Sequence, residues 1–133
     1  MTRYLLDTNI ISDLIRRPQG KAAQRIAQEG EDSVITSVIV AAELRYGSAK
    51  SGSKRLMKAV EDLLGEIEVT PFDVPADAEY GLIRSELEAA GTPIGGNDML
   101  IAAHARAIGA VVVTGNADEF KRVRNLKVEN WLA

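Results

Sequence analysis

The sequence contains no cysteine and a single histidine, His104. Without cysteine there can be no disulfide, thiol nucleophile, thiolate zinc site or iron–sulfur cluster. One imidazole also excludes catalysis by a pair of histidines and is too few for a histidine-based metal cage. Any chemistry in this protein must therefore use carboxylates, hydroxyls, amides and cations.

Long apolar runs and a positive net charge are missing as well. The longest apolar runs, residues 38–42 and 99–103, are far shorter than the roughly 18 residues that a membrane-spanning helix needs. Asp7 interrupts the apolar start of the chain, so no secretory signal is predicted, and we expect a cytoplasmic protein. The net charge of −3, from 16 basic and 19 acidic residues, argues against a protein that coats nucleic acid. It does not exclude an enzyme that binds nucleic acid through a metal.

The chain does contain an alternation of strand and helix patterns over 133 residues. Its apolar content of 46% and charged content of 26% are typical of a globular protein, and its length predicts one domain spanning residues 1–133. Expected strands cover residues 3–6, 33–36, 67–69 and 110–113, with an edge strand before Trp131. Expected helices cover residues 10–17, 21–28, 37–49, 56–64, 76–90 and 97–107, the last with Asn97 as its N-cap.

Strands that alternate with helices predict an α/β fold with a central parallel sheet and helices on both faces, because parallel neighbours need crossover connections. In such sheets ligands bind beyond the carboxyl ends of the strands. Polar side chains that directly follow a strand are therefore candidates for the functional site.

Three acidic residues from separate segments are poorly explained by structural roles alone. Asp7 directly follows the first strand, where it could also be a plain N-cap. Glu43 shares its helical face with mostly small or apolar residues, so its carboxylate is expected to point inward and to need a cation or hydrogen bonds. Asp98 opens a later helix on an apolar face, although acids are common in a first helical turn.

The loop after the last buried strand supplies further polar side chains. Asn116 and Glu119 are both candidates there, and either could be the main contact from this segment, whereas Asp118 is expected to be solvated. Thr8 and Thr114 adjoin site residues and could orient a carboxylate or a bound water.

Other helical residues are interpreted as structural. Ser12 and Asp13 fall on a polar face and are expected to be solvated, and Arg84 is expected to make an ordinary surface ion pair. His104 lies six residues after Asp98, nearly on the opposite face of its helix. We interpret it as structural or partner-facing rather than catalytic.

Acids that converge at one end of a sheet repel one another unless a cation neutralises them. Oxygen ligands without cysteine or histidine suit Mg²⁺ or Mn²⁺ rather than Zn²⁺. Such a site typically binds phosphate oxygens and activates water for in-line displacement, which needs no histidine base.

The ordered set of motifs resembles the PIN-domain ribonucleases of the VapC type, the toxins of bacterial and archaeal toxin–antitoxin pairs. The resemblance covers nearly the whole chain and rests on Leu6-Asp7-Thr8-Asn9, on Ser37-Val38 with Glu43-Leu44 and Tyr46-Gly47, on Ile94-Gly95 with Asp98 and residues 101–105, and on Val113-Thr114 with Asn116 and Glu119-Phe120. It implies a PIN-like domain in which Asp7, Glu43 and Asp98 hold Mg²⁺ or Mn²⁺ and the segment around Asn116 completes the catalytic site. Some relatives carry Asp where this chain has Asn116, and Glu119 could take part of that role.

The same resemblance implies an endoribonuclease that cleaves RNA, a cognate VapB-type antitoxin and a homodimer. A partner helix could bind apolar positions such as Met57, Leu63 and Leu64, although the protein's own core is the simpler interpretation of each. Basic residues outside the site could guide RNA toward it, namely Arg16, Arg17, Lys21, Arg25, Lys50 and Lys54.

Other kinds of protein fit the residues less well. A phosphatase of the haloacid-dehalogenase type would need a second Asp two residues after Asp7, where this chain has Asn9. A receiver-like signalling domain would need a Lys after a late strand, where Thr114-Gly115 stands. A catalytically degenerate PIN-like binding module is the remaining alternative, and the intact acids argue against it.

Overall fold

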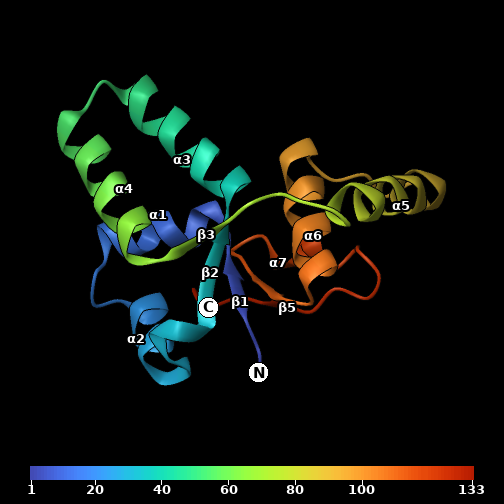
Figure 1. Cartoon of the computed structure of the whole chain (residues 1–133), viewed down its shortest axis with the longest axis horizontal. Helices are drawn as coiled ribbons and strands as arrows, with labels where there is room; N and C mark the ends of the chain where they lie inside the picture. The colour runs from blue at the N-terminus through green and yellow to red at the C-terminus, as the bar shows by residue number, and fades with distance from the viewer.

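The computed structural model describes residues 1–133 and has a five-stranded sheet between two groups of helices (Figure 1). All neighbouring strands are parallel, in the order β3-β2-β1-β4-β5. The strands are short: β1 (Tyr4–Leu6), β2 (Val34–Ser37), β3 (Glu68–Thr70), β4 (Val111–Val113) and β5 (Val128–Glu129). The predicted α/β class is confirmed.

The helices form two groups, one on each side of the sheet (Figure 1). One group consists of α1 (Thr8–Arg16), α2 (Lys21–Glu29), α3 (Val38–Ser51) and α4 (Lys54–Glu66), with a 3-10 turn, Glu31–Ser33, before β2. The other consists of α5 (Ala76–Ala90), α6 (Gly96–Ile108) and the short α7 (Ala117–Phe120). None of the helices combines the length and the apolar content needed to cross a membrane.

The core lies where the two central strands meet the helices. Leu5 and Leu6 of β1 and Val112 and Val113 of β4 are fully buried. Helices cover both faces of these strands, so successive side chains are all apolar instead of alternating with polar ones. Alanine-rich α6 contributes small buried side chains, which let the helix pack close to the sheet.

Local signals set several helix ends. Ser37 ends β2 and caps α3, accepting a hydrogen bond from the Ile39 amide at 3.0 Å. Gly109 ends α6 with φ of 70°, a left-handed conformation that favours glycine. The prediction that Asn97 caps α6 is wrong: Gly95 is the cap and the helix begins at Gly96. Asn97 therefore lies in the first turn, where its side chain is free to bond elsewhere.

The strand order decides where a ligand site can form. The chain builds β1, β2 and β3 outward in one direction and then returns to place β4 on the opposite side of β1. Connections therefore leave β1 and β4 toward opposite faces, and a crevice opens beyond their carboxyl ends. Asp7 follows β1 directly and Thr114 follows β4 directly, so both lie at this crevice.

Candidate active site

Asp7 is the most enclosed acid at this edge of the sheet, with 3% of its surface exposed. Its Oδ1 accepts a hydrogen bond from the Thr8 amide at 2.8 Å, so it is also the cap of α1. Its Oδ2 accepts from the Thr114 hydroxyl at 2.8 Å. Burial raises the pKa of Asp7, the hydrogen bonds from Thr114 and Thr8 oppose that rise, and the charges of Glu43 and Glu119 add to it.

Glu43 projects from α3 toward the same place. Its Oε1 accepts from the Thr8 hydroxyl at 2.8 Å and its Oε2 accepts from the Asn97 side-chain amide at 3.2 Å. Glu43 is half-buried and makes the hydrogen bonds expected of an inward-pointing carboxylate, whereas Tyr46, one turn later, is 67% exposed. This face of α3 borders an open cavity instead of the core.

Asp98 approaches from the first turn of α6. Burial, followed by the charges of Asp7 and Glu119, a hydrogen bond with Glu119 and the charge of Glu43, raises the pKa of Asp98 to about 7. Glu119 is held beside it, since its Oε1 accepts a hydrogen bond from the Gly95 amide at 2.9 Å. Four acids from four separate segments therefore act on one another electrostatically.

The loop after β4 contributes two residues in different ways. Asn116 is exposed, lines the cavity, and donates its backbone amide to the Thr114 hydroxyl at 2.9 Å. Glu119 is half-buried, and its negative charge raises the pKa of both Asp98 and Asp7. Asp118 is exposed, as expected.

Three of the four acids, all except Glu119, line an open cavity of about 360 Å³ that has no apolar side chain in its walls. Its walls comprise Asp7, Thr8, Asn9, Ser12, Arg16, Glu43, Asp98 and Asn116. Arg16, at the end of α1, is the single cation among them. A polar cavity with one cation and several acids is suited to a ligand that is itself charged and hydrated.

The site includes residues that the sequence interpretation left out. The Asn9 side-chain oxygen accepts a hydrogen bond from the Gly115 amide at 2.8 Å. Its side-chain NH₂ group donates to Asp7 Oδ2 and to the Thr114 hydroxyl, at 3.4 Å each. Asn9 therefore links the end of β1 to the end of β4. Its place in Leu6-Asp7-Thr8-Asn9 was a usable signal. Asn97, which holds Glu43, was misassigned as a cap.

Of two helical residues expected to be solvated, one is half-buried and the other is buried. Ser12 is half-buried in the cavity wall. Asp13 is 5% exposed and pairs with Arg17 at 2.8 Å, because the following turn of α1 brings the guanidinium over it. The prediction for Arg84 is confirmed, since it pairs with Glu88 at the surface, at 3.2 Å. His104 is buried, with 1% of its surface exposed, which favours the structural interpretation over the partner-facing one.

An apolar groove of about 370 Å³ adjoins the acidic cavity and shares Thr8, Ser12, Arg16 and Glu43 with it. Its apolar lining comes from α1, α3 and α4, through Ile15, Leu44, Leu56 and Val60. The positions proposed for a partner helix lie elsewhere on α4: Leu64 belongs to the core and Leu63 packs against it. Met57 is half-buried.

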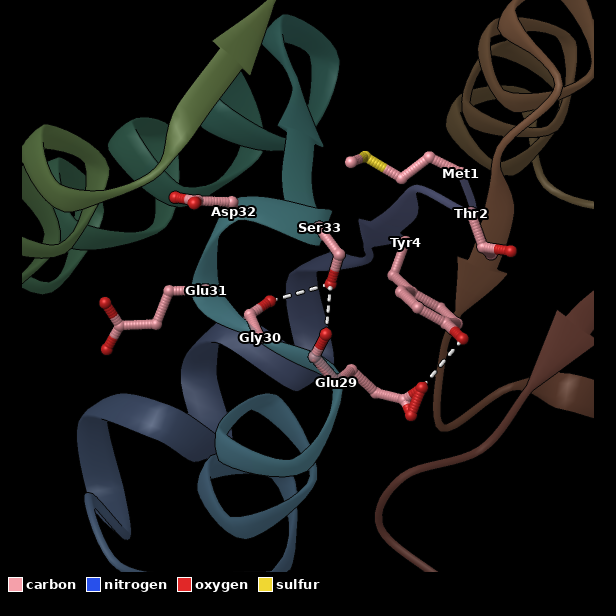
Figure 2. Close-up of a pocket in the computed structure, with 8 residues that line it drawn as sticks. All are labelled: Met1, Thr2, Tyr4, Glu29, Gly30, Glu31, Asp32 and Ser33. Carbon is pink, nitrogen blue, oxygen red and sulfur yellow. Dashed lines mark hydrogen bonds between the residues drawn. The ribbon is translucent and has the colours of Figure 1, made fainter.

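A second open concavity, of about 600 Å³, lies at the opposite, amino edge of the sheet (Figure 2). Its polar groups largely bond to each other: the Tyr4 hydroxyl donates to Glu29 at 2.9 Å, and the Ser33 hydroxyl bonds to the Gly30 carbonyl at 2.7 Å (Figure 2). None of the candidate site residues lines it. The candidate active site is therefore the cavity at the carboxyl edge of the sheet.

Known proteins resemble this chain in both sequence and fold. The family model of the PIN domain matches residues 4–126. The chain is 38% identical over 133 residues to Ribonuclease VapC2 of Haemophilus influenzae, covering 99% of this chain and 100% of that protein. It is 36% identical over 132 residues to the tRNA(fMet)-specific endonuclease VapC of Shigella flexneri, covering 98% and 99%. Among solved structures, VapBC2 of Rickettsia felis bound to a promoter DNA fragment superposes with a TM-score of 0.89 at 38% identity, over 98% of this chain and 99% of that one.

Proposed function

Because the chain belongs to the PIN-domain family, we propose that it is a metal-dependent endoribonuclease that serves as the toxin of a VapBC-type toxin–antitoxin pair. The observation that carries this proposal is the meeting of Asp7, Glu43, Asp98 and Glu119 at the carboxyl edge of the sheet, where their charges act on one another. A degenerate binding module would have no need to hold acids together against their repulsion.

We assign the binding of Mg²⁺ or Mn²⁺ to Asp7, Glu43 and Asp98, with Glu119 or Asn116 completing the site. The donor chemistry fits, since every candidate ligand is an oxygen and the acids lack a compensating cation apart from Arg16. In the arrangement described, the acids share one edge of the sheet, but no three of them lie close enough together to hold a metal ion without side-chain movement. Glu43 is hydrogen-bonded to the side chains of Thr8 and Asn97, and these bonds would rearrange if its carboxylate turned toward a shared cation.

When bound, the cation would neutralise the acids, polarise the scissile phosphate and lower the pKa of an attacking water. The reaction is a hydrolysis: the water oxygen bonds to phosphorus, the bond to the 3′ oxygen breaks, and that oxygen takes up a proton. The products are a 5′-phosphate and a 3′-hydroxyl. Thr8 and Thr114 hold the Glu43 and Asp7 carboxylates in place through their hydroxyl groups.

Arg16 gives the cavity a contact for RNA. It is exposed, forms no salt bridge, and lines the cavity together with Glu43 and Asp98. A guanidinium at this position suits a phosphate of the bound strand, whose negative charge the acids would otherwise repel. Since one relative is named for tRNA(fMet), a tRNA is the first defined substrate to test.

The apolar groove beside the cavity is the surface on which we place the antitoxin. A segment with an apolar face could bind against Ile15, Leu56 and Val60, and a basic side chain at its end would reach Glu43, which the groove shares with the cavity. We also propose a homodimer, in line with the two-fold symmetry usual among oligomers, and a cytoplasmic site of action, where the RNA is.

The test of the nuclease proposal is incubation of the purified chain with total RNA and with a defined tRNA. We expect cleavage with Mg²⁺ or Mn²⁺ and none after chelation, because the acids cannot approach a phosphate unneutralised. Cleavage that persists at full rate in a chelator would contradict the metal assignment, and the absence of cleavage with every metal and RNA would contradict the activity.

A further inference from the structure

A buried hydrogen bond joins the two helices that carry Glu43 and Asp98. His104 of α6 places its Nδ1 2.7 Å from the Ser37 hydroxyl oxygen, and both residues are buried, with 1% and 0% of their surfaces exposed. Ser37 caps α3 through the Ile39 amide. Glu43 lies six residues after Ser37, and Asp98 lies six residues before His104. The bond therefore fixes the start of one acid-bearing helix to the middle of the other.

This contact is the buried member of two side-chain hydrogen bonds between these segments. The other, from the Asn97 amide to Glu43 at 3.2 Å, is exposed and uses the Glu43 carboxylate itself. That tie must open if Glu43 turns toward a cation. The bond between His104 and Ser37 involves neither acid, so it can persist through such a movement.

Packing alone does not account for a histidine here. His104 Nε2 is buried and has no hydrogen-bond partner, an arrangement that lowers stability. Phe72 contacts the imidazole edge to face, with the ring centroids 5.5 Å apart, so the surroundings would accept an apolar side chain of similar size. What the imidazole provides, and an apolar group cannot, is the hydrogen bond to the cap of α3.

We propose that His104 and Ser37 form a positioning pair that sets the separation of Glu43 and Asp98, and thereby the affinity of the site for its divalent cation. The Ser37 hydroxyl accepts from Ile39 and still has its own proton to donate. As part of this proposal, we assign Ser37 as the donor to Nδ1 and place the imidazole proton on Nε2, since the direction of this bond depends on the tautomer. The inference rests on the metal-dependent function proposed above.

The test is Mn²⁺ affinity, measured from the electron paramagnetic resonance signal of the free ion, together with the Tm of the metal-free protein. In His104→Leu we expect Mn²⁺ affinity to fall about tenfold or more, the range found when partners that orient metal ligands are removed. The Tm serves as the fold control, because removing the unsatisfied Nε2 raises stability while leaving the buried Ser37 hydroxyl without its partner lowers it. His104→Asn, whose amide can occupy the Nδ1 position, should bind Mn²⁺ within about threefold of the wild type.

Two further variants keep the outcome clear. Ile101→Val removes a methylene from the buried face of the same helix and should lower the Tm without changing Mn²⁺ affinity. Ser37→Ala should weaken Mn²⁺ binding as His104→Leu does, and the double variant should lose no more than the weaker-binding single variant. Ser37→Ala also provides the readout if His104→Leu does not fold.

Equal Mn²⁺ affinity in the wild type, His104→Leu and Ser37→Ala would overturn the positioning role while leaving the nuclease proposal intact. An equal loss in His104→Asn and His104→Leu would also overturn it, since the restored hydrogen bond would then have no effect. A wild type that binds no Mn²⁺ would instead overturn the metal site on which the inference rests. The tautomer is checked separately by the ¹⁵N shifts of the imidazole, where a protonated Nδ1 would contradict the donor assignment.

Discussion

Asp7 and Glu43 differ in how firmly the surrounding donors hold them. Asp7 is buried and receives hydrogen bonds at both oxygens, from the Thr8 amide and the Thr114 hydroxyl. Glu43 is half-buried and is held by two side chains, those of Thr8 and Asn97, which can themselves rotate. Asp7 is therefore the fixed acid of the cluster, and Glu43 is the acid best able to adjust.

Replacing Asp7 with Asn should remove most RNA cleavage while leaving the fold intact. The amide keeps the size of the side chain but loses the charge needed for a cation, so we expect a fall of about two orders of magnitude or more in kcat/KM. Asp118→Asn is the matched control, because Asp118 is an exposed acid on the same loop as Asn116. An equal loss in both variants would show that Asp118 contributes to the site, and that Asn116 or Glu119 had been wrongly assigned as the contact from this loop.

Asp98 makes the stability of the metal-free protein depend on pH. Its pKa is about 7 in the folded chain, against an ordinary value of 3.8. Between these values the folded state binds the extra proton, so stability is highest below the lower pKa and falls as pH rises toward the higher one. Asn cannot ionise and avoids this loss.

Asp98→Asn should therefore stabilise the metal-free protein at pH 8 relative to the wild type, by about 1 kcal/mol, since solvent screens a half-buried carboxyl. The difference should vanish near pH 4, where the wild-type carboxyl is protonated in the folded state. Urea unfolding in a chelator at the two pH values measures it. A variant less stable than the wild type at pH 8 would contradict the repulsion assigned to this cluster.

At the scale of the elements, apolar spacing predicted the order of strands and helices because burial on both faces of a parallel sheet leaves a strong pattern. It did not predict the start of α6, since the backbone of Gly95 and not the side chain of Asn97 provides the cap. Nor did it predict that Asp13 is buried, because the compensating Arg17 is brought over it only by the fold of the helix end.

The same limit applies to the site. Position after a strand or on an apolar helix face pointed to Asp7, Glu43 and Asp98, which the structure brings to one edge of the sheet. The link from Asn9 to Gly115 joins residues 106 positions apart in the sequence. Pairs of this kind depend on strand order, which local patterns do not contain.

The end of α1 offers a test of how RNA reaches the acids. Arg16→Ala should raise KM for RNA about threefold to tenfold and leave kcat nearly unchanged, because a phosphate contact contributes to binding rather than to the reaction. The dependence of KM on salt should also weaken. Lys127→Ala, an exposed cation that directly precedes β5 and lies outside the cavity, is the control. A fall in kcat alone would argue that Arg16 acts on the reacting phosphate.

At the scale of the whole molecule, the acidic cavity and the apolar groove share one end of the fold. A partner that fills the groove would also cover the cavity. Growth arrest on expression of this chain should therefore be relieved by coexpression of its cognate antitoxin. Leu56→Glu, which places a charge in the groove wall, should weaken that rescue while preserving RNA cleavage. Toxicity that the antitoxin leaves unchanged would contradict the proposal that this partner inhibits the chain.

The chemistry of the cut RNA ends tests the central claim most directly. After cleavage with Mg²⁺, the new ends can be identified by ligation and by treatment with phosphatase and polynucleotide kinase. Attack by an activated water predicts 5′-phosphate and 3′-hydroxyl ends. Ends with a 2′,3′-cyclic phosphate would require attack by the ribose 2′-hydroxyl, and they would contradict hydrolysis at the acids of this site.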